Sequence, residues 1–373
     1  MDKKNFYCVI MAGGIGSRFW PASREDNPKQ FIDILGDGQS LIQKTYNRFR
    51  RFIPKENIFV VTGERYRQLT AEHLPELTPQ QILTEPFGRN TAPCIAYANK
   101  KIKFINATAT IVVSPADHLV SNEEQFQEDI VTGLEFATKN NDALLTLGIK
   151  PDHPNTGYGY IQIDKETKTS IENLYKVKTF TEKPNLELAK KFVQLGEFYW
   201  NSGMFIWNIN AIERAFEAYL PEMNFAFEER LTDINSDHET ETILDIYNNI
   251  KSISIDYGIM EKANKVFVLC TDFGWSDLGT WASLYAIGDK DSDKNNIRAK
   301  KSALYDTKDT ILFSQNKKKL YVLKGMDNFI IVDTDDALLI LPKQEEQSIK
   351  QIVGDLKLKK LINTNHDNRK NKH

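Results

Sequence analysis

The chain has 373 residues, of which 41% are hydrophobic and 27% are charged, and its formal net charge is −3. Because there is no basic excess to neutralise a phosphate backbone, we expect no nucleic acid partner. Three scattered cysteines without CxxC spacing argue against a disulfide framework. The sequence contains no apolar run long enough for a signal peptide or a membrane span, so we expect a cytoplasmic protein with no membrane partner.

The first 150 residues alternate short apolar runs with amphipathic segments. Phe6 to Ala12 is a continuous apolar run, which is typical of a strand buried on both faces. Further strands are expected at 58–61, 81–84, 110–114 and 144–147, and helices at 40–52, 64–74, 90–104 and after a capping pair formed by Ser121 and Glu124. Repeated β-α-β units with buried strands predict an α/β fold with a Rossmann-like, mostly parallel sheet.

After residue 150 the pattern is less regular. Strands are expected at 158–164, 177–181, 199–208 and 266–270, and helices at 186–195, 210–250 and 278–287. From 303 to 341, short strand-like pieces recur about every ten residues and predict a small all-β unit, either a few coils of a β-solenoid or a compact sandwich. With a closing helix at 345–361, the chain divides into an α/β domain at 1–290, a C-terminal β unit at 291–362 and a polar tail at 363–373.

A glycine-rich loop follows the first predicted strand. It reads Gly13-Gly14-Ile15-Gly16-Ser17-Arg18. Glycines allow backbone N–H groups to approach a triphosphate closely, and an arginine adds a planar, permanently charged donor. The loop lacks the GK[ST] of the P-loop and the third glycine of the dinucleotide fingerprint. Taken alone, it also fits an ordinary tight turn.

The residues after this loop carry a resemblance to a known family. They read Phe19-Trp20-Pro21-Ala22-Ser23-Arg24 and then Pro28-Lys29-Gln30-Phe31, a stretch too irregular to be a helix. Residues 9–31 resemble the signature of the mannose-1-phosphate guanylyltransferases, the sugar-nucleotide pyrophosphorylases that make GDP-mannose. The resemblance extends from residue 7 to about 281 and more weakly to about 355. It implies GTP and mannose 1-phosphate as substrates, GDP-mannose and pyrophosphate as products, and Mg²⁺ as cofactor.

The segment that starts at Glu85 resembles the part of the family that borders the nucleotide base. It reads Glu85-Pro86-Phe87-Gly88-Arg89-Asn90. Guanine offers an N1–H and an N2 amine, so the Glu85 carboxylate is a candidate acceptor, whereas Asn90 could simply cap the next helix. The nucleotide-binding residues implied by the resemblance are Ala12, Gly13, Gly14, Gly16, Ser17, Arg18, Glu85, Asn90, Pro115 and Asp117.

Two aspartates are candidate metal ligands. Asp117 follows a buried strand, at the edge of the sheet where open α/β folds bind ligands, and carboxylate oxygens suit Mg²⁺. The neighbouring His118 has no second His or Cys at ligand spacing and is not assigned to a metal. The segment 274–281 resembles the family region in which Asp277 is the second ligand. Taken alone, Asp277 would be an N-cap of the next helix.

Three later segments resemble the family's sugar site, and they lie at 157–161, 180–184 and 200–205. The resemblance implies that Gly159 leaves room for the hexose, that Glu182 accepts from sugar hydroxyls, that Lys183 meets the sugar phosphate and that Asn201 contacts the sugar. Together with Asp277 these are the predicted sugar-phosphate-binding residues.

The implied reaction is an in-line attack of the mannose 1-phosphate on the α-phosphorus of GTP. A phosphate monoester is already largely ionised at neutral pH, so no general base is needed. The predicted catalytic residues are Arg18 and Lys29 at the GTP phosphates, Lys183 at the attacking phosphate, and Asp117 and Asp277 as the Mg²⁺ ligands.

Two acidic segments look like other metal sites. Residues 289–300 begin like an EF-hand, but Lys294 and Lys300 stand where glycine and glutamate are required. Asp333-Thr334-Asp335 resembles the DxD of glycosyltransferases, but it lies between two apolar runs and is better explained as a hairpin turn.

Several alternatives stay open. The nucleotide or the hexose could differ, or the chain could be a glycosyltransferase that consumes a nucleotide sugar, or a regulator without activity. Some family members carry a C-terminal phosphomannose isomerase domain. The sequence ends before one could fit, so we expect the transferase activity alone. The C-terminal β unit is a candidate surface for a homodimer.

Overall fold

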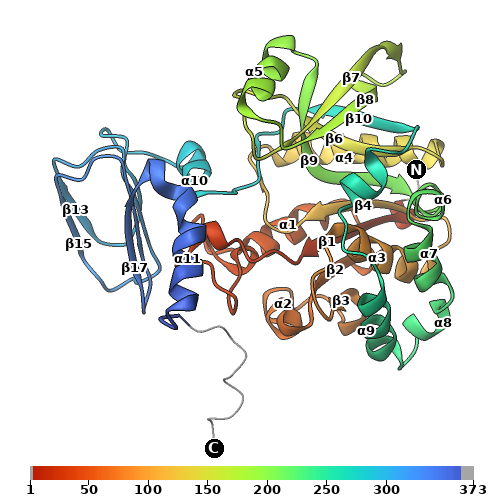
Figure 1. Cartoon of the computed structure of the whole chain (residues 1–373), viewed down its shortest axis with the longest axis horizontal. Coiled ribbons are helices and arrows are strands. Elements are labelled where there is room, and N and C mark those ends of the chain that lie inside the picture. The colour runs from red at the N-terminus through yellow and green to blue at the C-terminus, as the bar shows by residue number, and fades with distance from the viewer. Residues whose placement is uncertain (1–2, 363–373) are drawn as a thin grey trace, which may run out of the picture. The chain divides into compact units, whose positions relative to one another are not determined.

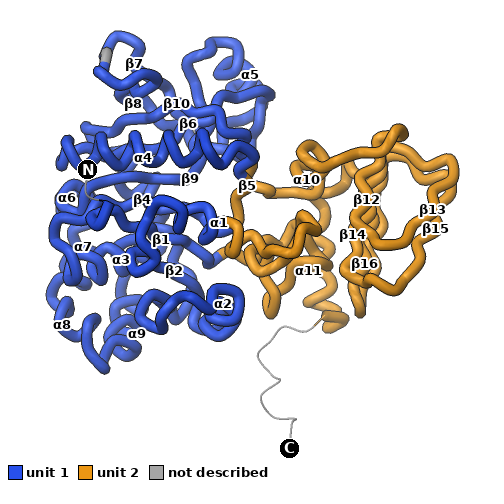
Figure 2. The backbone as a smooth tube through the Cα atoms, turned by 180° about the vertical axis from the view of Figure 1, so that it is seen from behind, with its two compact units in different colours: residues 1–13, 45–116, 120–275 blue, residues 14–44, 117–119, 276–373 orange. Residues whose placement is uncertain are grey.

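The computed structural model of the chain describes residues 3–362, so the predicted tail at 363–373 lies outside the described residues (Figure 1). The chain forms two compact units. Unit 1 contains the chain up to Gly13 with residues 45–116 and 120–275, and unit 2 contains residues 14–44, 117–119 and those from 276 onward (Figure 2). These units are defined by packing, and residues 14–44 belong with the C-terminal part. The division into domains at 1–290 and 291–362 stays a prediction.

The core of unit 1 is a nine-stranded sheet with the strand order β3-β2-β1-β4-β9-β6-β10-β8-β7. Its strands are β1 (Phe6–Ala12), β2 (Ile58–Gly63), β3 (Ile82–Glu85), β4 (Thr110–Pro115), β6 (Leu144–Ile149), β7 (Gly159–Lys168), β8 (Leu174–Glu182), β9 (Phe198–Asn208) and β10 (Val266–Thr271). In this sheet β9 is antiparallel to β4, β6 and β7, and β8 is antiparallel to β7 and β10. The other pairs are parallel, so seven of the nine strands run in one direction and β8 and β9 run in the other, which confirms the predicted Rossmann-like, mostly parallel sheet.

The carboxyl ends of β1 and β4 lie side by side. Met11 of β1 pairs with Pro115 of β4, and the backbone N–H of Ala116 donates to the Met11 carbonyl at 2.9 Å. In the sequence, the glycine loop directly follows β1, and Asp117 comes two residues after the end of β4. The glycine loop and Asp117 therefore lie at the carboxyl edge of the sheet, which is where parallel α/β sheets bind ligands.

Helices cover both faces of this sheet. They are α1 (Leu41–Phe49), α2 (Arg67–His73), α3 (Thr91–Ile105), α4 (Glu123–Lys139), α5 (Leu186–Leu195), α6 (Ile209–Tyr219), α7 (Pro221–Glu228), α8 (Leu231–Ile234) and α9 (Glu239–Asn249), followed by a short π-helix (Asp256–Met260). Helices α3, α6 and α9 share one hydrophobic cluster with residues of β1 and β4, whereas α4 packs on β4, β6, β9 and β10. Figure 1 shows α4 and α3 on different sides of the sheet.

Two predicted helix starts differ in their outcome. The helix predicted to begin at residue 40 is α1, with Ser40 and Gln43 as its capping pair, because the Ser40 N–H donates to Gln43 Oε1 at 2.9 Å. The predicted cap of α4 is wrong by one residue. Asn122 accepts from the Gln125 N–H at 3.1 Å, while the Ser121 N–H donates to the Gly274 carbonyl at 3.0 Å. Ser121 is thus engaged with another segment before the helix begins.

Unit 2 contains a small β-solenoid. One of its sheets consists of the parallel strands β12 (Asn296–Arg298), β14 (Ile311–Ser314) and β16 (Phe329–Asp333), with β17 (Leu338–Pro342) added antiparallel to β16, and the second consists of β13 (Ser302–Tyr305) and β15 (Tyr321–Lys324). The repeated parallel coils identify a solenoid and not the sandwich that was the alternative. Two helices, α10 (Trp281–Ile287) and α11 (Ile349–Leu358), complete the unit, and the short strands β5 (Leu119–Val120) and β11 (Trp275–Ser276) lie where the chain passes between units.

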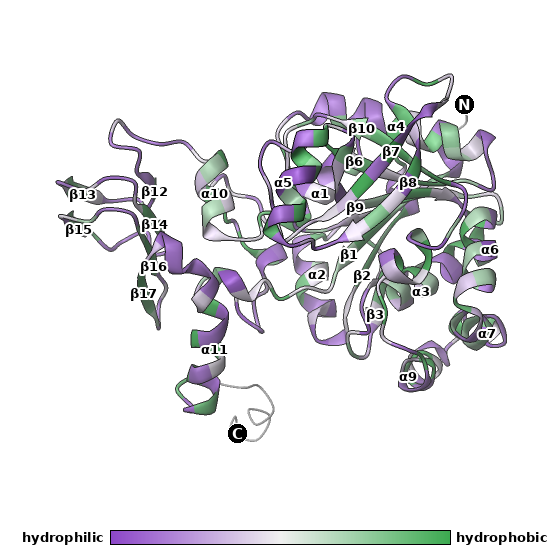
Figure 3. Cartoon of the chain, turned by 45° about the horizontal axis from the view of Figure 1, so that its top comes forward, coloured by the Kyte–Doolittle hydropathy of each residue, from purple (hydrophilic) through white to green (hydrophobic). Residues whose placement is uncertain are grey.

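The segment 14–44 is held in unit 2 by aromatic packing and by an ion pair. Phe19 meets Trp281 edge-on with 4.9 Å between the ring centroids. Arg24 donates two hydrogen bonds of 2.7 Å to the Asp336 carboxylate, in the turn between β16 and β17. That turn confirms the hairpin predicted at 333–335. In both units hydrophobic residues concentrate on the strands, and hydrophilic residues gather on outer faces such as that of α11 (Figure 3).

Candidate functional site

The glycine loop packs directly against Lys29. Ala12 ends β1 and is buried, whereas Gly13 and Gly14 are exposed. Gly16 has a φ of 69°, and a Cβ atom on it would lie 2.5 Å from the Cβ of Lys29. A side chain at this position would be strained and would also collide with Lys29. The conformation of the loop and the position of Lys29 therefore depend on each other.

Lys29 joins three segments of unit 2 that are far apart in the sequence. Its side chain is only 3% exposed, and its Nζ donates to Oδ2 of Asp117 at 2.8 Å and to the backbone oxygen of Asp277 at 2.7 Å. Burial raises the pKa of the Asp117 carboxyl, but the charges of Lys29 and His118 and the hydrogen bond from Lys29 outweigh it, so this pKa lies below its usual value. The structure thus brings together three predicted catalytic residues around one buried ammonium group.

Asp277 lies in a strained turn and does not cap a helix. The N-cap of α10 is Thr280, whose hydroxyl accepts from the Ser283 N–H at 3.2 Å, so the explanation of Asp277 as an N-cap is wrong. The Asp277 carboxylate accepts from the Gly279 N–H at 3.0 Å instead. The next residue, Leu278, is fully buried with a φ of 45°, a conformation rare outside glycine. This turn directs the Asp277 carbonyl toward Lys29.

Two predicted residues are not drawn into this buried cluster. Ser17 and Arg18 belong to a 3-10 helix (Ser17–Phe19) in which Phe19 is buried and Arg18 is exposed.

His118, which was not assigned to a metal, lies with its Nε2 4.0 Å from Asp117 Oδ1. Within residues 3–362, no group of three or more His, Cys, Asp and Glu side chains is placed to hold a metal ion. Any cation at Asp117 and Asp277 would take its other ligands from elsewhere.

In unit 1, Glu85 is a buried carboxyl group. It is 6% exposed and its Oε1 accepts a hydrogen bond of 2.9 Å from the Tyr247 hydroxyl. Burial raises the pKa of Glu85 to about 7, although the bond from Tyr247 lowers it. A Cβ atom placed on Gly13 would lie 3.8 Å from Oε2 of Glu85. The second carboxyl oxygen therefore lies beside the start of the glycine loop.

Asn90 and Pro115 occupy positions that local structure explains. Asn90 caps α3, because its Oδ1 accepts from the Thr91 N–H at 3.0 Å, and its φ is 70°. Pro115 is the last residue of β4 and is partly buried. The structure brings neither residue into the contacts described for Lys29 or Glu85.

The predicted sugar residues of unit 1 lie together around Gly159. A Cβ atom on Gly159 would lie 2.4 Å from Oε2 of Glu182 and 3.5 Å from the Cβ of Asn201. The Glu182 carboxylate therefore occupies the place that a side chain at position 159 would take, next to the Cβ of Asn201. Lys183 is exposed, pairs with Glu182 and has a φ of 46°. These four predicted residues form one cluster.

The orientation of the Asn201 amide is set by three neighbours. Its Oδ1 accepts from the Gly203 N–H at 3.2 Å and from the Thr146 hydroxyl at 3.1 Å, and its Nδ2 donates to Asp256 at 2.7 Å. Because both oxygen lone pairs are engaged, Asn201 has one N–H left to offer a ligand. Burial, together with the nearby charge of Glu182, raises the pKa of Asp256 although the bond from Asn201 lowers it.

Sequence reasoning missed Asp256 and Tyr247. Asp256 is the one charged residue in the otherwise apolar-rich stretch 253–260. A carboxylate in such a stretch could have indicated a functional role from the sequence. It begins the π-helix, a form often found at functional sites. Tyr247 lies within the region 210–250, which was predicted only as helical. Nothing in that stretch indicated a contact with Glu85, which is 162 positions away.

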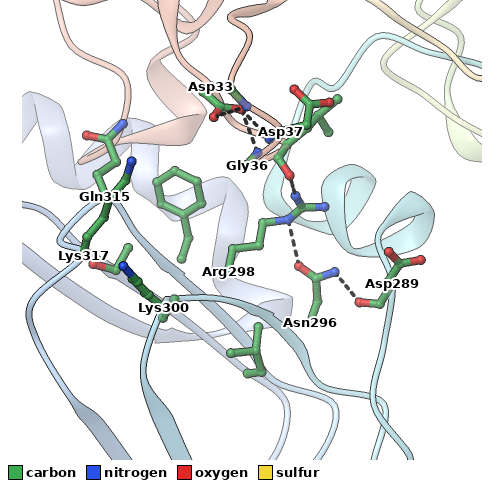
Figure 4. Close-up of a pocket in the computed structure, with 15 residues that line it drawn as sticks. Asp33, Gly36, Asp37, Asp289, Asn296, Arg298, Lys300, Gln315 and Lys317 are labelled. Carbon is green, nitrogen blue, oxygen red and sulfur yellow. Dashed lines mark hydrogen bonds between the residues drawn. The ribbon is translucent and has the colours of Figure 1, made fainter.

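Unit 2 also contains a cavity of about 980 Å³, between the loop at 33–38 and the strands β12 and β14 (Figure 4). Its polar groups bond to one another. Arg298 donates to the Leu35 carbonyl and to Asn296, and the Asp33 carboxylate accepts from the Gly36 N–H at 2.7 Å. The predicted site residues do not line this cavity, and its internal bonds fit a structural role in fixing the loop.

No helix within residues 3–362 is both long enough and apolar enough to cross a membrane.

Comparisons with known proteins identify the family of the chain. A family model described as nucleotidyl transferase matches residues 7–294, and a model of the MannoseP isomerase/GMP-like beta-helix domain matches residues 301–356. The chain is 37% identical to a mannose-1-phosphate guanylyltransferase of Escherichia coli over 356 residues, which cover 94% of this chain and 75% of that protein. It is 36% identical to the mannose-1-phosphate guanylyltransferase RfbM of Salmonella typhimurium, with 95% of this chain and 73% of the relative covered.

A solved structure extends the similarity to the fold. The crystal structure of mannose-1-phosphate geranyltransferase from Thermus thermophilus has a TM-score of 0.84 to this chain at 28% sequence identity. The match covers 95% of this chain and 99% of that one, so it includes both the large sheet and the β-solenoid.

Proposed function

This chain belongs to the mannose-1-phosphate guanylyltransferase family of nucleotidyltransferases, and we propose that it transfers GMP from GTP to α-D-mannose 1-phosphate, giving GDP-mannose and pyrophosphate. The observation that carries this proposal is the contact of Lys29 with Asp117 and Asp277. Three segments that the sequence assigned to phosphates and metal, and that lie far apart in the chain, meet at one buried charge, which is an arrangement suited to polyanionic substrates.

In the proposed reaction, an oxygen of the mannose phosphate forms a bond to the α-phosphorus of GTP. The bond from that phosphorus to the bridging α,β-oxygen breaks, and pyrophosphate leaves with the electron pair. The attacking oxygen already carries negative charge, so no side chain has to remove a proton. The task of the protein is to hold two polyanions in line and to neutralise the charge that develops on the leaving group.

Lys29 and Arg18 have different roles in this proposal. Lys29 is buried and bonded on two sides, so its charge stays at one position throughout the reaction. Arg18 is exposed at the end of the glycine loop and is free to close on the GTP phosphates, with the loop amides as further donors. Lys183, also exposed, would meet the phosphate of the sugar.

Asp117 and Asp277 fit a hard divalent cation, and we propose Mg²⁺. Both side chains carry carboxylate oxygens, and Lys29 bonds to Oδ2 of Asp117 and to the backbone oxygen of Asp277, which brings the two residues to one ammonium group. Oδ2 of Asp117 is bonded to Lys29, so Oδ1 is the candidate ligand atom. Two protein carboxylates are enough where phosphate oxygens complete the coordination. When bound, the cation would supply positive charge to the reacting phosphates.

The cluster around Gly159 would bind the hexose. Glu182 and Asp256 are acceptors for sugar hydroxyls, and Asn201 offers its remaining N–H as a donor. A Cβ atom on Gly159 would lie so close to Oε2 of Glu182 that any side chain there would displace the Glu182 carboxylate. In this proposal Gly159 is needed for the position of Glu182, and the sugar binds beside that carboxylate.

Replacing Arg18 by alanine is expected to reduce kcat about a hundredfold or more while leaving the thermal unfolding temperature within about 1 °C of the wild type. The reason is that Arg18 is exposed and stands outside the buried Lys29 cluster. Steady-state kinetics with GTP and mannose 1-phosphate, together with differential scanning fluorimetry, would measure both quantities. Near-normal turnover of the variant would remove Arg18 from the site.

The proposed activity is tested by pyrophosphate release from the purified chain with Mg²⁺. Each of the four ribonucleoside triphosphates and dTTP would be supplied with mannose 1-phosphate and with glucose 1-phosphate. Release with GTP and mannose 1-phosphate alone supports the proposal in full. Release with another pair keeps the chemistry and changes the specificity. No release with any pair, while nucleotide still binds, would contradict the proposal and favour a regulator or a glycosyltransferase.

We further propose that the chain acts in the cytoplasm and forms a homodimer through the C-terminal β unit. Leu338 and Ile340 of β17 are 57% and 51% exposed, which leaves apolar surface at the edge of the solenoid. Light scattering that gives a monomeric mass at micromolar concentration would contradict the dimer.

A further inference from the structure

The two oxygens of the Glu85 carboxyl group have different surroundings. Oε1 accepts from the Tyr247 hydroxyl at 2.9 Å, whereas Oε2 faces Gly13, where an added Cβ would lie 3.8 Å away. Gly13 is exposed and begins the glycine loop, while Glu85 is 6% exposed. Tyr247 thus holds one oxygen in the interior and leaves the other directed toward the loop.

Tyr247 is itself held firmly. Its side chain is fully buried on α9, and the ring of Phe87 meets it edge-on at 6.1 Å between centroids. The Arg89 guanidinium lies 5.1 Å above the Phe87 ring, and its Nε donates to the Tyr247 backbone oxygen at 3.0 Å. Three residues of the segment 85–89 therefore contact Tyr247. These contacts hold the tyrosine hydroxyl next to Glu85.

We propose that Tyr247 is a positioning residue for base selection, which orients Glu85 so that its carboxylate accepts from the N1–H and N2 amine of guanine. This inference rests on the proposed function and adds a residue to its base site. An ionised carboxylate complements the two donors of guanine. A protonated carboxyl complements adenine instead, because Oε2 then carries the proton and donates to adenine N1. The state of Glu85 therefore decides which purine fits.

The surroundings of Glu85 place its ionisation near neutral pH. Burial raises its pKa to about 7, and the bond from Tyr247 lowers it. The groups that face it are Tyr247 from α9 and Cys94 from α3, both neutral at this pH, since burial raises the pKa of each well above its usual value. Arg67 of α2 bonds to the adjacent Thr84 at 2.7 Å, and Arg89 bonds to the Tyr247 backbone. As pH rises through 7, the carboxylate form and hence guanine selection should increase.

The first test compares Tyr247→Phe with a matched control, Tyr97→Phe. Tyr97 is also buried, and its hydroxyl is bonded to Glu239 at the start of the same helix instead of to Glu85. We expect Tyr247→Phe to raise the KM for GTP about tenfold, without raising the KM for mannose 1-phosphate, since a hydrogen bond to a charged group is lost. The control should leave both unchanged. A folded Tyr247→Phe with wild-type KM for GTP would overturn the inference.

A double variant separates positioning from simple packing. In a Glu85→Ala background the hydroxyl of Tyr247 has no side chain at position 85 to orient, so adding Tyr247→Phe should change the KM for GTP by less than about twofold. An undiminished tenfold effect in that background would mean that Tyr247 does not act through Glu85, which would contradict the proposal.

A measurement on the wild-type protein covers the case in which the variants fail to fold. The ratio of kcat/KM for GTP to that for ATP should rise at least about tenfold from pH 6 to pH 8, as expected for a group of pKa about 7. Ionisation of the triphosphate cancels in this ratio. A flat ratio would overturn the inference, while absence of any turnover of GTP with mannose 1-phosphate in the same assay would overturn the proposed function itself.

Discussion

Replacing Lys29 by methionine is expected to reduce kcat for GDP-mannose formation by at least about a hundredfold and to lower the thermal unfolding temperature by about 5 °C. Both effects have the same origin. The Lys29 ammonium is almost completely buried and bonds to Asp117 and to the Asp277 carbonyl. Its removal takes away a fixed positive charge from the proposed phosphate site and leaves both oxygens without their donor.

The loss of stability should depend on pH. The pKa of Asp117 is lowered in the folded chain, so its contribution is present above the unfolded value near 4 and is lost as pH falls through the folded value. The difference in unfolding temperature between wild type and Lys29→Met should therefore be largest near neutral pH and shrink in acid. Scanning fluorimetry from pH 3 to pH 7 would follow it.

Lys308→Met is the matched control for Lys29. Lys308 also belongs to unit 2 and pairs with Asp327 at 3.3 Å, but both side chains are more than half exposed. Exposed pairs contribute little to stability, so this variant should keep its unfolding temperature and its kcat. If Lys29→Met lowered the unfolding temperature while kcat stayed normal, Lys29 would be a structural residue only.

The substitution Asp277→Asn should reduce kcat by about a thousandfold without a measurable change in unfolding temperature. Asparagine has the same shape as aspartate and keeps a side-chain oxygen. This oxygen can accept from the Gly279 N–H, which in the wild type donates to Oδ1 of Asp277 at 3.0 Å. The bond to Lys29 comes from the Asp277 backbone and is also kept. The change therefore removes the carboxylate charge while keeping these two hydrogen bonds.

Kinetics at several Mg²⁺ concentrations would measure the loss, and binding of Mn²⁺ in the presence of GTP, followed by electron paramagnetic resonance, would report the cation directly. We expect weaker Mn²⁺ binding in Asp277→Asn and wild-type behaviour in the control Asp272→Asn, which changes an exposed aspartate five positions earlier. Unchanged Mn²⁺ binding together with full activity would exclude Asp277 as a ligand.

Local sequence rules were sufficient for the elements that position the site. The apolar run from Phe6 to Ala12 is β1, and the predicted sheet edge is confirmed by the pairing of Met11 with Pro115. Buried parallel strands, loops at their carboxyl ends and the hairpin at 333–335 all follow from patterns within about ten residues. The signature at 9–31 identified the family, since its residue types are unusual in combination.

Tertiary structure decided which side chains meet. The sequence alone predicted Lys29 as a phosphate ligand, but not that it is buried or that its partner at Asp277 is a backbone oxygen 248 positions away. Tyr247 and Asp256 lay outside every recognised motif, yet they bond to Glu85 and Asn201. Capping pairs, strand periods and glycine turns depend on neighbours in the chain, so one sequence reveals them. Contacts across a hundred or more residues depend on where the sheet and the solenoid bring the chain back, and only the folded structure contains that information.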